Sequence, residues 1–452
     1  MKPRFLNHAL IIGIIFIIIQ QSIVASSTAL IALLSQSIMS GYGYMLWLVL
    51  FVISLSVVYI PTMLTNYFFN KALYTTYGEY ILNFSKQAYN HPNCYFNSRF
   101  REEKESYFTH EAWLIIREVN QFIMDALSIF FNVFLNVLVL SMFLDWAFLA
   151  AYVIAVPLSL VCILLSKSRL QKKSDAMQKS RSEMMQSLGS GWDTILIGNK
   201  WNMSLWRDKF VSRWGIADKA QRKLTLEIDA MSLITLVVSA LPILAVLFMS
   251  FMRAQGDAAM LAMLVATAPR QVLTIQYLSD IIGLFVKLGD KVRRTKRLSE
   301  NLVFDETSRE IGGKITWGSV YIEETAIHSY DDLNLLTNKF KSGRYTITGD
   351  NGTGKTTLLT MIKAELGDSA YLLPSQSKMT FFSEVQQREF STGEKTLENL
   401  REISNNVCDG EVTVLLLDEW NANLDKENIR QIDLEIDELS TVACVIEVLH
   451  KV

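Results

Sequence analysis

Residues 343–366, GRYTITGDNGTGKTTLLTMIKAEL, combine a strand-like run, a glycine-rich turn and a helix-forming run. Within them Gly349, Gly354, Lys355 and Thr356 fit the spacing G-x-x-x-x-G-K-[ST], in which backbone N–H groups surround a phosphate. The start of the following helix adds its positive dipole end. We therefore expect Lys355 to reach the β- and γ-phosphates of a nucleotide and Thr356 to ligate Mg²⁺. The expected nucleotide-binding residues of this loop are Gly349, Asp350, Asn351, Gly352, Thr353, Gly354, Lys355, Thr356 and Thr357.

Two adjacent carboxylates end a second strand-like run, VTVLLLDEW at residues 412–420. Asp418 suits the Mg²⁺ shell of a phosphate-loop enzyme, and Glu419 suits a general base that polarises the attacking water. An ordinary acidic pair at a strand end is the alternative, but the upstream phosphate loop favours the catalytic interpretation.

A polar turn lies between the two motifs, in FSTGEKTLENLREI at residues 390–403. Ser391 and Glu394 fit the S-x-x-E capping box, so the turn is expected to open a helix. The capping box leaves open what the exposed N–H groups at this helix start bind.

The chain before residue 290 is dominated by long apolar blocks, and 50% of all 452 residues are apolar. Each block approaches or exceeds the roughly 20 residues that a helix needs to cross the hydrocarbon core. The first block is too long for the apolar region of a signal peptide and lacks a clean cleavage site, so we expect a retained span. The six predicted spans are about 10–34, 45–64, 122–144, 147–165, 231–252 and 258–288.

Lys and Arg gather in the long connections after the second and fourth spans, whereas the other connections are short and carry almost none. The positive-inside rule therefore places both termini in the cytoplasm. The long connections are rich in helix formers, so the spans should extend as helices, with turns near 91–100 and 189–201 whose short helices could contact a cytoplasmic domain.

A formal net charge of −2 gives no general attraction to nucleic acid. The four cysteines lack metal-site or CxxC spacing and are interpreted as reduced thiols.

Several polar side chains lie inside the predicted spans, where such residues often line a water-filled cavity. Interhelical hydrogen bonding is the alternative. Arg270 would favour an anionic group in such a cavity. The candidate cavity residues are Gln20, Gln21, Arg270, Gln271 and Thr274, with Asp125 and Gln276 as further polar residues.

Together these features resemble the ATP-binding cassette (ABC) family, and specifically its fused half-transporters of the exporter type. GDNGTGKTT resembles the family's first phosphate motif, VLLLDE its second, FSTGEK its signature, and NANLD at 421–425 the loop after the catalytic carboxylate. The resemblance implies an all-α six-helix transmembrane domain at residues 1–300 and an α/β nucleotide-binding domain at 301–452. It also implies ATP and Mg²⁺ as cofactors, and a dimer with two ATP molecules between the cassettes.

The resemblance assigns roles to further residues. Gln376 matches the glutamine that links Mg²⁺ to the membrane domain, although Ser375 intervenes between it and the usual proline. His450, after the strand-like run ending at 449, matches the switch histidine that contacts the γ-phosphate beside Glu419. The aromatic side chain that stacks on adenine has three candidates, Trp317, Tyr321 and Tyr330. The signature residues that would act on the partner's ATP are Ser391, Thr392, Gly393 and Glu394.

Two departures from the family pattern bear on activity. The segment between residues 355 and 391 is short, so the helical subdomain must be reduced, and Thr392 stands where the signature has its first glycine. We expect ATP-driven export of a substrate by a homodimer, or a heterodimer, in a bacterial cytoplasmic membrane. LLLDEWNANLD, with Trp420, is reminiscent of exporters of small or cyclic peptides. The alternatives are an exporter-fold importer or lipid flippase, and a membrane-anchored regulatory module that binds ATP with little turnover.

Overall fold

The computed structural model divides into two compact units, which are described separately. The first comprises Met1–Glu79 and Ala112–Ser299, and the second comprises Tyr80–Glu111 and Glu300–Val452. The division after Ser299 lies one residue from the predicted boundary, but the second unit also takes in residues 80–111. The structure describes residues 5–89, 91–95, 104–105, 107–304, 313, 315–329, 331–332, 342–374, 379, 381, 392–408, 412–422 and 424–449.

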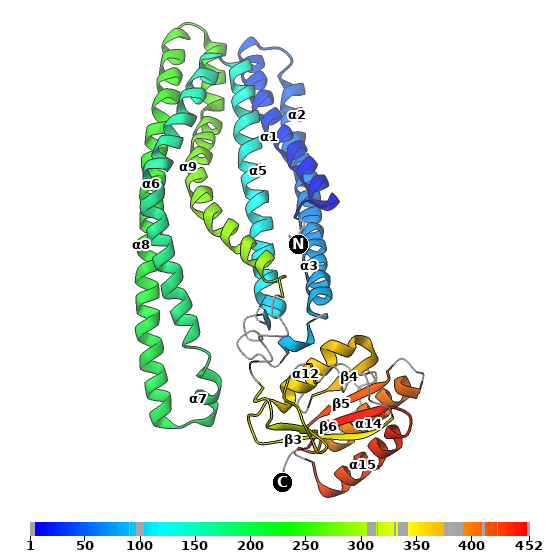
Figure 1. The fold of residues 1–452 in the computed structure, drawn as a ribbon. Coiled ribbons are helices and arrows are strands. Elements are labelled where there is room, and N and C mark those ends of the chain that lie inside the picture. The colour runs from blue at the N-terminus through cyan, green and yellow to red at the C-terminus, as the bar shows by residue number, and fades with distance from the viewer. Residues whose placement is uncertain are drawn as a thin grey trace. The chain divides into compact units, whose positions relative to one another are not determined.

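Helices, most of them long, form the first unit (Figure 1). They are α1 (His8–Ser40), α2 (Tyr44–Val57), α3 (Tyr59–Tyr89), α5 (Ala112–Phe143), α6 (Ala147–Gln186), α7 (Gly191–Ile197), α8 (Lys200–Arg253) and α9 (Ala258–Glu300). Local signals fix some of their ends. The Asn7 side chain accepts a hydrogen bond from the Leu10 N–H at the start of α1, and Gly41 ends the helix in a left-handed conformation that a glycine adopts without strain.

Among the described residues, six helices are long and apolar enough to span a membrane, as the sequence predicts. They lie at His8–Ser40, Tyr44–Tyr89, Ala112–Phe143, Ala147–Ile197, Lys200–Arg253 and Ala258–Leu278. α2, all of whose residues are described, is strongly apolar and has no buried residue. Such a helix needs a non-aqueous solvent around it, which indicates an integral membrane protein.

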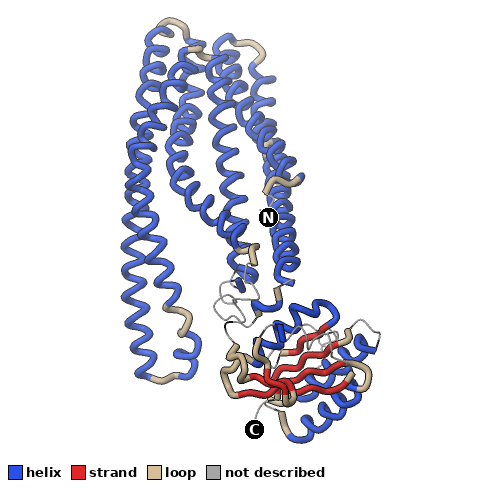
Figure 2. Tube along the Cα trace, in the orientation of Figure 1, coloured by secondary structure: helices blue, strands red, loops and turns tan. Residues whose placement is uncertain are grey.

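A mixed sheet forms the centre of the second unit (Figure 2). Its described strands have the order β2-β1-β3-β6-β5-β4; β3, β6, β5 and β4 are parallel, and β1 pairs antiparallel with β2 and β3. The strands are β1 (Val320–Ile322), β2 (Thr325–Ala326), β3 (Gly343–Gly349), β4 (Ala370–Leu373), β5 (Val414–Asp418) and β6 (Cys444–Val448). All residues of β5 and β6 are buried, which is typical of parallel strands covered on both faces.

Helices pack on both faces of this sheet. α12 (Lys355–Leu366) covers one face, where Leu358 and Ile362 pack with Leu416 and Ile446. α14 (Thr392–Cys408) and α15 (Lys426–Ser440) cover the other, where a second apolar cluster forms. The side chains of that cluster on the helices are Leu400, Ile403, Ile432 and Ile436, and those on the strands include Leu415, Leu417 and Val445. The α/β domain expected from the sequence is therefore present.

The second unit also includes the end of α3 and the short helix η1 (Pro92–Cys94). The Tyr89 hydroxyl, just before η1, donates a hydrogen bond to Oδ1 of Asp368 over 2.5 Å. This short helix lies in the first of the two turns where the sequence suggests contact with a cytoplasmic domain. Residues 91–95 thus belong to the same compact unit as the sheet.

Candidate functional site

The glycine-rich loop joins β3 to α12 and uses glycine where other residues would not fit. Gly349, Gly352 and Gly354 have φ angles of 153°, 82° and 98°. A Cβ at position 349 would lie 2.7 Å from the backbone oxygen of Ser319, which is closer than real contacts allow. The loop also packs against the preceding segment, since the Thr316 N–H donates to the Thr353 carbonyl over 3.0 Å. The backbone therefore requires glycine at these positions.

Lys355 is the first residue of α12, and its side chain turns back over the loop. The ammonium Nζ donates to the carbonyl oxygens of Gly349, at 2.9 Å, and Asp350, at 3.0 Å. These carbonyls hold a positive charge at the point where the loop meets the N-terminal end of α12. That combination of cation and helix start is suited to a phosphate group.

The next residue links the loop to the second motif. The Thr356 hydroxyl donates to Oδ1 of Asp418, the last residue of β5, over 2.9 Å. Asp418 is 3% exposed, and burial raises the pKa of its carboxyl to about 6, although Thr356 and Lys355 act in the opposite direction. A divalent cation held by this hydroxyl and carboxylate would offset the cost of the buried charge.

The Thr356 hydroxyl and the Asp418 carboxylate are oxygen ligands, which is the ligand type that magnesium prefers. Within the part of the chain that the structure describes, no cluster of three or more His, Cys, Asp or Glu side chains could hold a metal by itself. Magnesium usually takes one or two carboxylates and completes its shell with water and substrate phosphates. Thr356 and Asp418 beside the loop supply such a partial shell.

Glu419 follows Asp418 in a strained backbone conformation. Its φ angle is 45°, in the left-handed region that residues other than glycine rarely adopt. Its N–H donates to the carbonyl of Val448 over 2.8 Å, and its own carbonyl accepts from the Ala422 N–H over 3.0 Å. Strained residues of this kind cluster at functional sites.

The parallel sheet brings the glycine-rich loop and the pair Asp418 and Glu419 to the carboxyl-terminal end of its strands. In the register of β6, Val448 pairs with Ile347 of β3 and with Asp418 of β5. The loop after β3, the pair Asp418 and Glu419 at the end of β5, and Leu449 after β6 therefore lie at the same carboxyl-terminal end of the parallel strands. His450 itself lies outside the described residues.

Several other predicted residues are described in part or not at all. Gln376, Ser391 and Tyr330 lie outside the described residues. Thr392, Gly393 and Glu394 form the first turn of α14, but their side chains are not among those described. Of the adenine candidates that are described, Trp317 packs against the first apolar cluster, and Tyr321 is 39% exposed on β1.

Next to Glu419, the structure has a buried polar network of Trp420, Glu447 and Arg344 that no sequence motif predicts. The Trp420 indole N–H donates to Oε2 of Glu447 over 2.8 Å, and the Arg344 guanidinium binds both oxygens of Glu447 at 2.8 and 3.0 Å. Arg344 also pairs with Asp433 and Asp437 of α15, at 2.7 and 2.6 Å. Burial disfavours the charge of Arg344, but these carboxylates outweigh it and raise its pKa above the ordinary value. One feature of the sequence points to this network: Glu447 is a charged residue inside the apolar run CVIEV.

Polar residues also meet inside the membrane helices. Gln21 of α1 accepts a hydrogen bond from the Asn132 side chain of α5 over 2.7 Å, which is the interhelical bonding considered as the alternative to a cavity role. Arg270 of α9 donates to the Ser27 hydroxyl of α1 over 3.2 Å, and the Thr274 hydroxyl donates to the Arg270 carbonyl over 2.9 Å.

Two remaining cavity candidates differ in burial. Gln20 is half-buried. Gln271 is 1% exposed, and neither polar atom of its side chain has a partner among the described residues.

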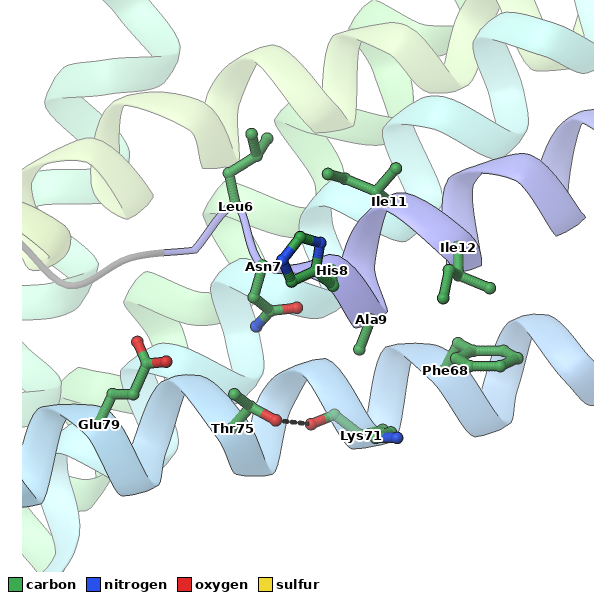
Figure 3. Close-up of a pocket in the computed structure, with 10 residues that line it drawn as sticks. All are labelled: Leu6, Asn7, His8, Ala9, Ile11, Ile12, Phe68, Lys71, Thr75 and Glu79. Atoms are coloured by element: carbon green, nitrogen blue, oxygen red, sulfur yellow. Dashed lines mark hydrogen bonds between the residues drawn. The ribbon is translucent and has the colours of Figure 1, made fainter.

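A separate pocket of about 410 Å³ lies between the start of α1 and α3 (Figure 3). The close-up shows both helices contributing to it, with a polar end around Asn7, Thr75 and Glu79 and apolar side chains along Ile11, Ile12 and Phe68. None of its lining residues was a predicted site residue. The lining residues are Leu6, Asn7, His8, Ala9, Ile11, Ile12, Phe68, Lys71, Thr75 and Glu79.

Comparisons with known proteins add no family to these observations. A scan against protein-family models finds no match, and a search of curated proteins finds none either. The functional assignment therefore depends on the geometry of β3, α12 and β5.

Proposed function

We propose that this protein is an ATP-hydrolysing membrane transporter of the ABC type, which exports a small peptide or a peptide-like compound across a bacterial cytoplasmic membrane. The observation that carries the proposal is the hydrogen bond from Thr356 to Asp418. It joins the glycine-rich loop to the end of β5, where Asp418 is followed by Glu419, so that phosphate binding and water activation share one site. The six apolar helices supply the path across the membrane.

In the proposed reaction, the loop N–H groups and Lys355 bind and orient the β- and γ-phosphates. Mg²⁺ held by Thr356, Asp418 and Gln376 would offset the phosphate charge. The Glu419 carboxylate accepts a proton as water attacks the γ-phosphorus, and the bond from that phosphorus to the β–γ bridging oxygen breaks to release ADP and phosphate. His450 is assigned to the γ-phosphate in this scheme.

A second copy of the chain completes the proposed site. The signature residues 391–394 of one copy would contact the ATP on the loop of the other. The short helix α7 and the start of α8 support an assembly, because they expose large apolar side chains: Trp192 and Ile197 of α7 are 75% and 68% exposed, and Trp201 of α8 is 71% exposed. Such a patch at the tip of a helical hairpin is typical of a protein contact surface.

Steady-state hydrolysis by the full-length protein in lipid nanodiscs tests this proposal. Lys355→Ala and Glu419→Gln should each lower kcat by about 100-fold or more, because each removes a group acting on the γ-phosphate or its attacking water. The matched control is Glu438→Gln, the same chemical change at an exposed position of α15, which should keep the wild-type rate. Unchanged hydrolysis in Glu419→Gln would contradict the catalytic assignment.

The cargo and direction need a transport measurement. ATP-dependent accumulation of a labelled small peptide in inside-out vesicles, lost in Lys355→Ala, is the expected result for an exporter. Uptake in the reverse orientation would favour an importer, and movement of lipid alone would favour a flippase. ATP binding without measurable turnover in wild type would favour the regulatory module.

A further inference from the structure

The two neighbours of Glu419 are fixed to opposite faces of the sheet. Asp418 points to the face covered by α12, where Thr356 binds it. Trp420 is 6% exposed within the apolar cluster on the other face, where its indole N–H donates to Glu447. Glu419 is thus held between two anchored residues.

The hydrogen bonds that fix Asp418 and Trp420 explain why Glu419 keeps a left-handed backbone conformation. A left-handed conformation is unfavourable for a residue other than glycine, so the surroundings must stabilise it at Glu419. The bond from the Glu419 N–H to Val448 and the bond from the Trp420 indole to Glu447 both end on neighbouring residues of β6. Together they fix the turn to a single strand.

Glu447 can serve as an anchor because its charge is compensated. The side chain is 2% exposed, and a buried carboxylate without a partner would be strongly unfavourable. Arg344 binds both of its oxygens from β3, the strand that leads into the glycine-rich loop. Such bidentate pairing fixes the carboxylate in orientation as well as in position.

We infer that the Trp420–Glu447 hydrogen bond, fixed by Arg344, positions the Glu419 carboxylate for activation of the attacking water. Trp420, Glu447 and Arg344 are positioning residues in this scheme, because they act through Glu419. The inference rests on the proposed ATP hydrolysis. It adds a second requirement for hydrolysis: hydrogen bonds on the sheet face opposite α12 must hold the turn at Glu419 in place.

Trp420→Phe tests this role in the full-length protein in lipid nanodiscs, because it keeps the aromatic ring and removes the N–H donor. We expect kcat for ATP to fall by about 10- to 100-fold, since small displacements of a catalytic group are this costly. KM for ATP should stay within about twofold, because the phosphate loop is untouched. Trp146→Phe, at a position 65% exposed before α6, is the matched control and should leave both constants unchanged.

The decisive comparison is made in the Glu419→Gln background. If Trp420 acts through Glu419, adding Trp420→Phe to Glu419→Gln should cause no further loss of kcat. A further loss as large as in wild type would show that Trp420 acts independently, and would overturn the inference. Wild-type kcat in Trp420→Phe would overturn it as well.

Glu447→Gln supplies a second variant in case Trp420→Phe does not fold. It keeps an acceptor oxygen for the indole but breaks the charged pairing with Arg344, so kcat should fall less than in Trp420→Phe, again with little change in KM. Unchanged kcat would overturn the positioning role. If Glu419→Gln instead hydrolyses ATP at the wild-type rate, that result contradicts the proposed function and therefore the positioning role as well.

Discussion

The Thr356 hydroxyl donates to Oδ1 of Asp418 over 2.9 Å, and this bond joins residues that lie 62 positions apart in the chain. One belongs to the first turn of α12 and the other ends β5. The contact brings the glycine-rich loop, the Thr356 hydroxyl and a buried carboxylate together. We propose that this arrangement holds a magnesium nucleotide.

Thr356→Val should weaken binding of MgATP by about tenfold, because it keeps the side-chain shape and removes the metal-ligating hydroxyl. The affinity for ATP in the presence of a chelator should change much less. Thr360→Val is the matched control, since the Thr360 hydroxyl lies one turn further along α12 and bonds only to the Thr357 carbonyl among the described contacts. Nucleotide titration by fluorescence, with and without Mg²⁺, measures the difference. An equal loss under both conditions would contradict a role in metal binding.

Gly349→Ala should abolish nucleotide binding and destabilise the second unit. The added Cβ would meet the Ser319 oxygen at 2.7 Å, so β1 or the loop must move. Gly215→Ala, inside α8 with open space around the Cβ, is the control and should stabilise the helix by about 1 kcal/mol or less. Thermal unfolding and ATP titration of both variants check this. Normal ATP binding by Gly349→Ala would show that the loop tolerates the side chain.

Gln271→Leu and Gln21→Leu should separate a cavity role from a structural one. Gln21 bonds to Asn132, so its loss leaves a buried amide without that partner and should destabilise the helices by roughly 0.5–2 kcal/mol. Gln271 makes no such bond among the described residues, so its replacement should leave stability unchanged or increase it. Thermal unfolding in detergent gives the stability. Reduced transport by stable Gln271→Leu would support a cavity role, and unchanged transport would argue against one.

Cys444 should resist thiol reagents in the folded protein. Burial raises the pKa of its thiol from an ordinary 9.0 to about 12, so almost no thiolate forms at pH 8. Because the unfolded thiol ionises first, its contribution to stability is complete below pH 9 and falls as the pH rises from 9 toward 12. Maleimide labelling followed by peptide mass spectrometry should find Cys444 modified only after denaturation. Rapid labelling of the native protein would contradict the burial of β6.

Local patterns in the sequence were sufficient to predict the six apolar helices and the strand–loop–helix around Lys355. Both depend on residues close together in the chain: unbroken apolar runs in one case, glycine and lysine spacing in the other. The sequence did not predict which strands pair; the parallel pairing of β6 with β3 and β5 places their carboxyl-terminal ends together.

The network behind Glu419 could not be predicted in the same way. Trp420 and Glu447 are 27 positions apart, and Arg344 and Glu447 are 103 apart, so only the folded sheet brings them together. The left-handed backbone of Glu419 carries no sequence signal, because no glycine or asparagine occupies the position. Likewise, nothing in the sequence distinguishes Gln21, which has a partner on α5, from Gln271, which has none among the described residues.

Single-turnover phosphate release tests the central claim most directly. Full-length wild type and Glu419→Gln in lipid nanodiscs would be mixed with radiolabelled MgATP, and bound ATP and released phosphate would be followed in the same samples. We expect equal ATP binding, with phosphate release from Glu419→Gln slowed by about 100-fold or more. Release from the variant at the wild-type rate would contradict the assignment of Glu419 and of this site as an ATPase.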